Sequence, residues 1–222
     1  MIKQKHKCGI PSAAEYRPRT PAGGEAVRRM GDILISLLCL GLLWPLMLTT
    51  VLLLLMEEPG ASPVFLQTRV GRDGREFTLF KFRSMIPGAE EQLEELLPRN
   101  EMDGPVFKLR RDPRITPLGR FLRRSSIDEL PQLFNVLRGE MSLVGPRPAL
   151  PREVARYDQR ARGRLTVKPG MTCYWQIRPD RNSLCFQEWL ELDLQYIRER
   201  SIPVDLLILL KTIGAVARMD GV

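Results

Sequence analysis

Two adjacent acidic residues, Asp128 and Glu129, stand beside a dense group of cations in this chain of 222 residues. The stretch 108–124, KLRRDPRITPLGRFLRR, holds seven basic residues and one acid, and Arg147 follows in a Gly-Pro-Arg-Pro turn. A carboxylate among so many cations stays ionised, so it could act as a nucleophile or bind a divalent metal. The arginines could bind phosphate groups. Carboxylate chemistry on a phosphorylated substrate is the first hypothesis.

The acidic pair is expected at the start of a helix. Pro131 is tolerated only in a first turn, so the helix that carries the following apolar residues should begin near residues 127–129. Ser126 and Glu129 have the spacing of a capping box. The simpler alternative is that both acids are ordinary first-turn residues, which are common at helix starts.

A β-hairpin is predicted upstream, with strands at 63–70 and 76–85 joined by the turn GRDG. Lys81 and Arg83 lie two residues apart, so they share one face of the second strand. Charges at such positions are commonly solvent-facing residues of an edge strand.

Residues 33–56 contain no charge and are long enough, as a helix, to cross a membrane. Pro45 lies near the middle and predicts a kink, for which Thr49 and Thr50 offer polar groups. Basic residues flank the segment on both sides, which favours both ends on the cytoplasmic side. The residues alone leave a re-entrant hairpin and a single span open.

The net charge of +8 and a pI near 9.7 indicate an anionic partner: nucleic acid, an anionic membrane face or phosphorylated substrates. No groove-reading motif accompanies the basic stretch, so we expect no nucleic acid. His6 is the only histidine, which argues against histidine catalysis and a His-containing zinc site. The four cysteines have no C-x-x-C spacing, which is typical of reduced thiols.

Four strings together resemble one family: KFRSM (81–85), DPRITPLGRFLRRSSIDELPQLFNVLRGEMSLVGPRP (112–148), KPGMT (168–172) and ELDLQYI (191–197). The chain resembles the bacterial sugar transferases, the monotopic phosphoglycosyl transferases. The resemblance implies transfer of a sugar 1-phosphate from a UDP-sugar to polyprenyl phosphate at the cytoplasmic face of the bacterial inner membrane. It also implies a two-step reaction that releases UMP and starts the synthesis of a polysaccharide or glycoconjugate.

The resemblance assigns roles to residues of this chain. Asp128 is expected to be the nucleophile and to hold part of a Mg²⁺ ion, and Glu129 to assist the acceptor or the metal. Arg123 and Arg147 are expected to bind phosphate oxygens. Weaker substrate-binding roles fall to Lys81, Arg83 and Arg181.

The expected fold is α+β and mostly helical. It comprises a basic N-terminal tail (1–27), a re-entrant membrane hairpin (28–58) and a catalytic domain (59–222) with a small sheet and interfacial amphipathic helices. Helices are predicted at 88–97, 186–201 and 203–220, the last in the membrane interface or on the core. Asp193 is expected to be a structural acid paired with an arginine.

Two positions depart from the family's usual pattern. Cys173 stands where a glycine is typical, which could alter the turn because cysteine tolerates a positive φ poorly. Asp180 stands where a glycine commonly precedes Arg181, which weakens the role given to that arginine. The alternative function is a non-catalytic membrane scaffold that binds anionic lipids or a partner protein.

Overall fold

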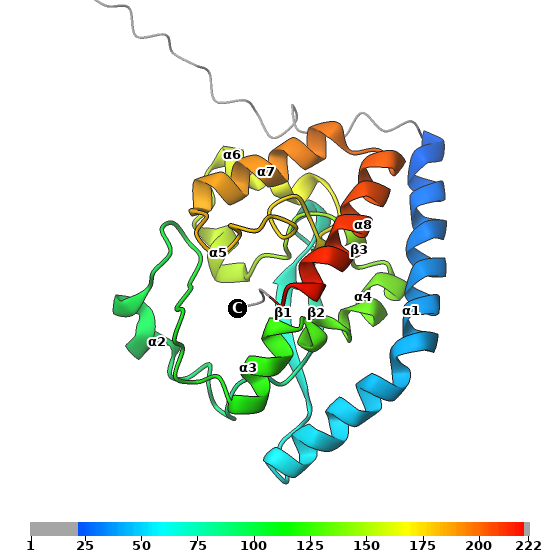
Figure 1. The fold of residues 1–222 in the computed structure, drawn as a ribbon. Coiled ribbons are helices and arrows are strands. Elements are labelled where there is room, and N and C mark those ends of the chain that lie inside the picture. The colour runs from blue at the N-terminus through cyan, green and yellow to red at the C-terminus, as the bar shows by residue number, and fades with distance from the viewer. Residues whose placement is uncertain (1–21, 220–222) are drawn as a thin grey trace, which may run out of the picture.

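In the structure, a computed structural model that describes residues 22–219, the long N-terminal helix runs along one side and a β-hairpin crosses the middle (Figure 1). Shorter helices pack around the hairpin, and two sheets have two strands each. This agrees with the predicted mostly helical α+β class. The helices are α1 (Ala22–Glu57), α2 (Leu93–Leu96), α3 (Pro117–Arg124), α4 (Gln132–Arg138), α5 (Pro151–Ala155), α6 (Gln159–Arg162), α7 (Phe186–Glu199) and α8 (Ile202–Ala217). The strands are β1 (Val64–Val70), β2 (Glu76–Phe82), β3 (Ser142–Val144) and β4 (Gly170–Thr172), and short 3₁₀ turns are η2 (Arg72–Gly74), η3 (Leu97–Arg99), η4 (Ile127–Glu129) and η5 (Gly163–Thr166).

Helix α1 is one continuous bent helix, not the two arms of a hairpin (Figure 1). Pro45 lies inside this helix. It is long and apolar enough to cross a membrane by length and composition. The hydroxyls of Thr49 and Thr50 donate to the carbonyls of Pro45 and Leu46, a pattern that bends helices. They do not reach the carbonyl one turn before Pro45 that the proline leaves unbonded. The helix begins at Ala22, within the predicted tail, and residues 1–21 lie outside the described part.

The N-terminal half of α1 is tied to the rest of the fold by polar contacts. Arg29 donates to the carbonyls of Val136 and Leu137 at 2.5 and 2.6 Å, which satisfies the C-terminus of α4. Asp32 accepts from the amide of Leu143 at 3.0 Å and from the hydroxyl of Ser142 at 3.1 Å, both in β3. One apolar helix therefore fixes both α4 and β3.

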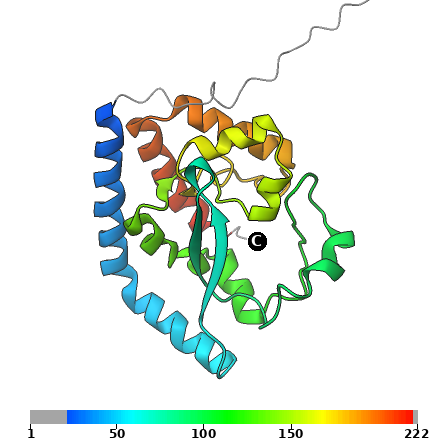
Figure 2. The same ribbon diagram turned by 180° about the vertical axis from the view of Figure 1, so that it is seen from behind.

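The hairpin β1–β2 crosses the middle of the structure and is seen from behind in Figure 2. Strand β1 pairs with one edge of β2, and the side chain of Asn135 in α4 pairs with the other. Its amide oxygen accepts from the N–H of Phe80 at 3.1 Å, and its amide nitrogen donates to the carbonyl of Thr78 at 2.7 Å. The same nitrogen donates to Glu140. The side chain of Asn135, which is fully buried, takes the place of a peptide group in a third strand.

The second sheet joins two segments that are far apart in sequence, because β3 pairs in parallel with β4. The sequence of residues 164–177 predicts a strand pair around the turn Lys168-Pro169-Gly170. Strand β4 is found there, but its partner is the distant β3. The backbones meet closely at Gly145 and Gly170: a Cβ on Gly170 would lie 2.0 Å from the amide nitrogen of Gly145. Only glycine fits at this crossing.

The predicted C-terminal helices are confirmed as α7 and α8. The predicted acidic helix at 88–97 is reduced to the four residues of α2, followed by η3, and the residues before it form turns. In helix α3, Leu122 is buried against Leu54 and Phe82, whereas Phe121 is exposed.

Replacing Asn135 by alanine should destabilise the protein by about 2 kcal/mol or more, because two buried backbone groups of β2 lose their partners. Thermal unfolding of the detergent-solubilised protein measures this. Gln195→Ala, which removes a solvent-exposed hydrogen bond to Glu199, is the control and should change little. Equal effects of the two substitutions would contradict the role given to Asn135.

Candidate active site

The acidic pair lies in the 3₁₀ turn η4, directly before α4. The start predicted near residues 127–129 is therefore confirmed for the turn, but the α-helix itself begins at Gln132. The predicted capping box is wrong, because Ser126 adopts a left-handed conformation (φ 58°) and its side chain makes no capping hydrogen bond. The side chain of Glu129 instead reaches a cation on the neighbouring strand.

That cation is Lys81 of β2. Its Nζ lies 2.8 Å from Oε1 of Glu129 and 3.9 Å from Oδ2 of Asp128. Asp128 is 5% exposed, while the side chains of Lys81 and Glu129 remain about a quarter to a third exposed (26% and 32%). One ammonium group on β2 thus faces both carboxylates.

The two carboxylates differ in their electrostatics. Burial raises the pKa of Asp128 to about 6, helped by the charge of Glu129 and opposed by Lys81 and Arg123. Burial acts in the same direction on Glu129, but Lys81, through its charge and hydrogen bond, outweighs it and holds the pKa of Glu129 below its ordinary value. The charges of Arg147 and Arg181 add to this lowering. The surrounding charges thus favour the ionised form of Glu129 more than that of the buried Asp128.

Arg123 lies at the end of α3, close enough to Asp128 for its charge to lower that group's pKa. Its Nε donates to the hydroxyl of Ser84 at 2.9 Å. Ser84 was not singled out from the sequence, although it lies inside the KFRSM string. Helix α3 can approach this segment because Gly119 has no side chain: a Cβ there would lie 2.0 Å from the carbonyl oxygen of Ser84.

Arg147 and Arg181 reach the same site from other parts of the chain, since the charges of both act on Glu129. An Nη of Arg147 lies 3.5 Å from a carboxylate oxygen of Glu153, a buried acid in the first turn of α5 that sequence reasoning missed. Arg181 donates to the carbonyl of Gln176 and lies near Lys108.

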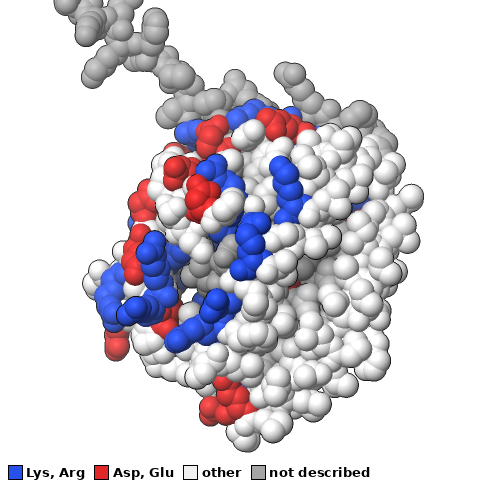
Figure 3. Space-filling model, in the orientation of Figure 1, with Lys and Arg blue, Asp and Glu red and all other residues white. Residues whose placement is uncertain are grey.

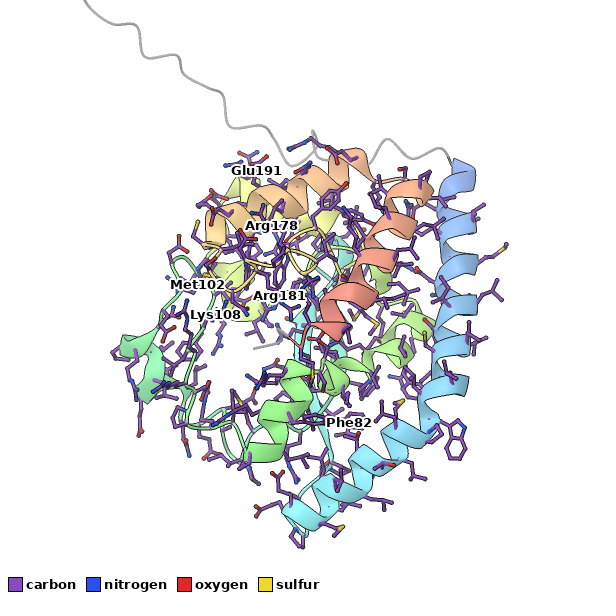
Figure 4. All side chains as sticks on the ribbon, in the orientation of Figure 1. Phe82, Met102, Lys108, Arg178, Arg181 and Glu191 are labelled. Atoms are coloured by element: carbon purple, nitrogen blue, oxygen red, sulfur yellow. The ribbon has the colours of Figure 1, made fainter. Side chains whose placement is uncertain are left out.

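Lys108 is a further cation of the site that the sequence did not single out individually. Its Nζ donates to the carbonyl of Asn182 at 2.8 Å, and burial, with the charges of Arg110 and Arg181, lowers its pKa. Figure 4 shows Lys108 and Arg181 between the segment that carries α2 and helix α7. Lys and Arg side chains gather around a hollow in this part of the surface (Figure 3). The arrangement can bind a multiply charged anion.

Arg83 does not belong to this group. It follows β2 and is buried, and its guanidinium donates to the carbonyls of Leu54 and Ser62 at 2.6 and 3.0 Å. The first contact lies in the last turn of α1, and the second lies in the loop that joins α1 to β1. The weak substrate-binding role predicted for Arg83 is therefore replaced by a structural one.

The structure also places Asp193, Cys173 and Asp180, three further residues that the sequence singled out. Asp193 pairs with Arg164 at 2.7 Å in the core, as expected of a structural acid. Cys173 is not among the described non-glycine residues with a positive φ, so it does not disturb the turn. Asp180 is exposed and pairs with Arg178, two residues before it. The side chain of Arg181 instead donates to the carbonyl of Gln176.

The predicted Mg²⁺ fits the donors present only in part. Within residues 22–219, no three His, Cys, Asp or Glu side chains form a cluster that could hold a metal ion. Mg²⁺ commonly uses one or two carboxylates together with substrate phosphates, which Asp128 and Glu129 could supply with a bound diphosphate. The site thus suits an ion that arrives with its substrate.

The sequence profile described as "Bacterial sugar transferase" matches residues 24–219, nearly all of the described chain. The chain belongs to this family. One member, "Exopolysaccharide production protein ExoY" of Rhizobium meliloti, is 40% identical over 205 residues, which cover 90% of this chain and 89% of the relative.

Longer members of the family are similar as well. "Galactosyl transferase CpsE" of Streptococcus agalactiae is 48% identical over 75% of this chain and 37% of its own length. "Undecaprenyl-phosphate galactose phosphotransferase" of Salmonella typhimurium is 42% identical over 88% of this chain and 41% of its own length. The chain therefore spans about two fifths of the length of several of the curated relatives that it matches.

Replacing Lys81 by methionine should lower the unfolding temperature at pH 7.5 by a few degrees, since about 1 kcal/mol corresponds to ~2–4 °C at this size. Lys81 favours the ionised form of Glu129, whose pKa lies below its ordinary value. The stability that this provides is present above the unfolded-state pKa and is lost as the pH falls through the folded-state value. The difference from wild type should therefore begin to shrink as the pH falls below 4.5, the ordinary pKa of this group.

Thermal unfolding at several pH values checks this, with Lys211→Met as the control because Lys211 is exposed on α8. A loss for Lys81→Met that stays equal as the pH falls below 4.5 would show that lost packing, and not charge, is responsible.

Proposed function

We propose that this protein transfers a sugar 1-phosphate from a UDP-sugar to polyprenyl phosphate and so begins the synthesis of an exopolysaccharide or related glycan. The observation that carries the proposal is the buried carboxylate of Asp128 beside Glu129. The charges of Lys81 and Arg123 act on Asp128, and those of Arg147 and Arg181 act on Glu129. The names of two relatives support this proposal. One is called "Undecaprenyl-phosphate galactose phosphotransferase" and the other "Exopolysaccharide production protein ExoY".

In the first step a carboxylate oxygen of Asp128 attacks the β-phosphorus of the UDP-sugar. The bond between that phosphorus and the bridging oxygen breaks, and UMP leaves with the electron pair. The sugar phosphate is then held on Asp128 as an acyl phosphate. Such covalent catalysis divides a difficult displacement between two anions into two easier steps.

In the second step a phosphate oxygen of the polyprenyl phosphate attacks the same phosphorus. The bond to Asp128 breaks, which restores the carboxylate and releases polyprenyl-diphosphate-sugar. Glu129 assists the incoming acceptor or the metal from the next position in the turn. Arg123 and Arg147 bind phosphate oxygens, and Arg181 contributes charge at the donor side.

A Mg²⁺ ion held partly by Asp128 would supply charge neutralisation for the diphosphate when it is bound. Arginine and lysine side chains of the chain itself provide the remaining positive charge. Lys81 also keeps Glu129 ionised, because its charge lowers the pKa of that carboxylate.

Membrane attachment follows from the exposed apolar surfaces. Leu38, Leu42 and Trp44 of α1 are 71%, 73% and 59% exposed, and Leu210 and Ile213 of α8 are 68% and 69% exposed. Such surface is costly in water and suits lipid. We propose that α1 enters and leaves the cytoplasmic leaflet of the inner membrane, with α8 in the interface near anionic lipids, so that the site meets the phosphate of the acceptor.

The competing function is a membrane-bound scaffold that binds lipid or a partner without turnover. The Asp128–Glu129 pair favours the enzyme, because binding an anion does not require two acids within the cationic site. Turnover separates the two functions, since the scaffold releases no UMP from any donor.

Asp128→Asn should reduce Mg²⁺-dependent UMP release by a factor on the order of 10³ or more, because the amide cannot act as the nucleophile. The measurement uses a panel of UDP-sugars with undecaprenyl phosphate and the purified, folded protein. Glu58→Gln, in an exposed position after α1, is the matched control. A trapped phosphosugar adduct that maps to any residue other than Asp128 would disprove the assignment.

Cysteines placed at residues 26 and 58, before and after the apolar segment, should both be protected from a membrane-impermeant maleimide in intact spheroplasts and react after lysis. Cys8, Cys39 and Cys185 are first replaced by serine, and Cys173 is buried. Labelling of only one of the two positions from outside would show a single span.

A further inference from the structure

Two buried arginines donate hydrogen bonds to backbone carbonyls of the turn that carries Arg147. Nη1 of Arg69 donates to the carbonyl of Pro148 at 2.9 Å, and Nη2 of Arg164 donates to the carbonyl of Arg147 itself at 3.3 Å. Both arginines are almost fully buried, at 7% and 4% exposure. They approach from different elements, since Arg69 belongs to β1 and Arg164 to η5.

Arg164 is itself fixed in place by strong partners. It pairs with Asp193 of α7 at 2.7 Å and donates to the hydroxyl of Tyr157 at 2.7 Å, and the carboxylate of Asp193 is fully buried. The planar guanidinium thus makes contacts in three directions at once, which a lysine cannot reproduce. The position of the turn is linked through Arg164 to α7.

Arg69 has fewer partners than Arg164, and none of them is a carboxylate. It donates to Gln67 as well as to Pro148, and its Nε, like that of Arg164, has no hydrogen-bond partner within residues 22–219. Burial lowers its pKa to about 9, and the charge of Arg147 acts in the same direction. Burying an arginine without a carboxylate partner is costly. An apolar core does not need this cation in order to be stable. The hydrogen bond from Arg69 to the carbonyl of Pro148 therefore indicates its role, which is to hold the turn.

The side chain of Arg147 is oriented at its other end by Glu153. This acid, 1% exposed, also accepts from the amide of Leu150, so its position is fixed relative to the turn. The backbone of Arg147 and its guanidinium are therefore held by separate contacts. The guanidinium held in this way lies close enough to Glu129 for its charge to lower the pKa of that carboxylate.

We propose that Arg164, with its partner Asp193, and Arg69 are positioning residues: they fix the turn 145–149 so that Arg147 can bind a phosphate of the donor. They do not touch the substrate. The proposal rests on the proposed function, in which Arg147 binds a phosphate oxygen, and it extends the site to residues of the core.

A double-mutant cycle tests the coupling. Arg164→Lys and Arg69→Lys should each lower kcat/KM for the UDP-sugar by about 10- to 100-fold, the scale of a misplaced binding group. In an Arg147→Lys background each should cost less than about twofold more, because the group that they position has already been changed. Asp193→Asn should behave in the same way as Arg164→Lys.

Arg28→Lys is the matched control, since the buried ion pair of Arg28 with Asp205 joins α1 to α8 and does not contact the turn. Its effect on kcat/KM should be the same with and without Arg147→Lys. Equal effects of Arg164→Lys in the two backgrounds would overturn the proposal and leave only a structural role.

Hydrogen exchange provides a readout that does not depend on turnover. The amides of Gly145, Arg147 and Ala149, the residues of the turn that carry an N–H, should exchange faster in Arg164→Lys and Arg69→Lys than in wild type, while those of α4 remain unchanged. Unchanged exchange in the turn would overturn the positioning role even if the protein is active. Failure of the wild type to release UMP, with faster exchange in the variants, would overturn the proposed function alone.

Discussion

The side chain of Asn135 is the contact on which the site depends. It completes the open edge of β2 with the pairing that a neighbouring strand would supply, and it does so from the helix that follows the acidic turn. Strand β2 carries Lys81, and the turn carries Asp128 and Glu129. A short hydrogen-bonded link therefore fixes the distance between the cation and the carboxylates. The side-chain amide of Asn135 is buried, and both its oxygen and its nitrogen pair with backbone groups of β2. Strand β2 and helix α4 therefore cannot shift relative to each other without leaving polar groups unpaired.

The cations of this chain serve two purposes that composition does not separate. Arg114 pairs with Asp112 in a buried contact at 2.6 Å, and Arg83 caps a helix end, so neither charge is available to a ligand. Arg123 and Arg147, in contrast, act on the carboxylates of the site. The high positive charge of the sequence is thus partly a means of holding backbone carbonyls in place. The binding capacity comes from the smaller number of cations that face the acidic turn.

The site could be predicted from the sequence where its residues lie in local patterns. The acidic pair, Arg147 in its proline-rich turn and the hairpin bearing Lys81 were found this way, and the pairing of Asp193 with an arginine was expected. Arg83 was misplaced because the alternation of a strand says which face a side chain takes but not which helix end lies beside it. Glu153 and Arg69 were missed because their roles arise from contacts between segments far apart in sequence. The same limit hid β3, whose three residues pair with a strand 28 positions later.

The meeting of Gly145 and Gly170 bears on how this sequence can change. Each glycine belongs to a different string, one to Gly-Pro-Arg-Pro and the other to Lys-Pro-Gly, yet both are required by a single contact between backbones. A larger residue at one position cannot be accommodated by a smaller one at the other, because neither has a side chain left to lose. A second substitution therefore cannot compensate for the first. Both positions must remain glycine for as long as β3 and β4 pair.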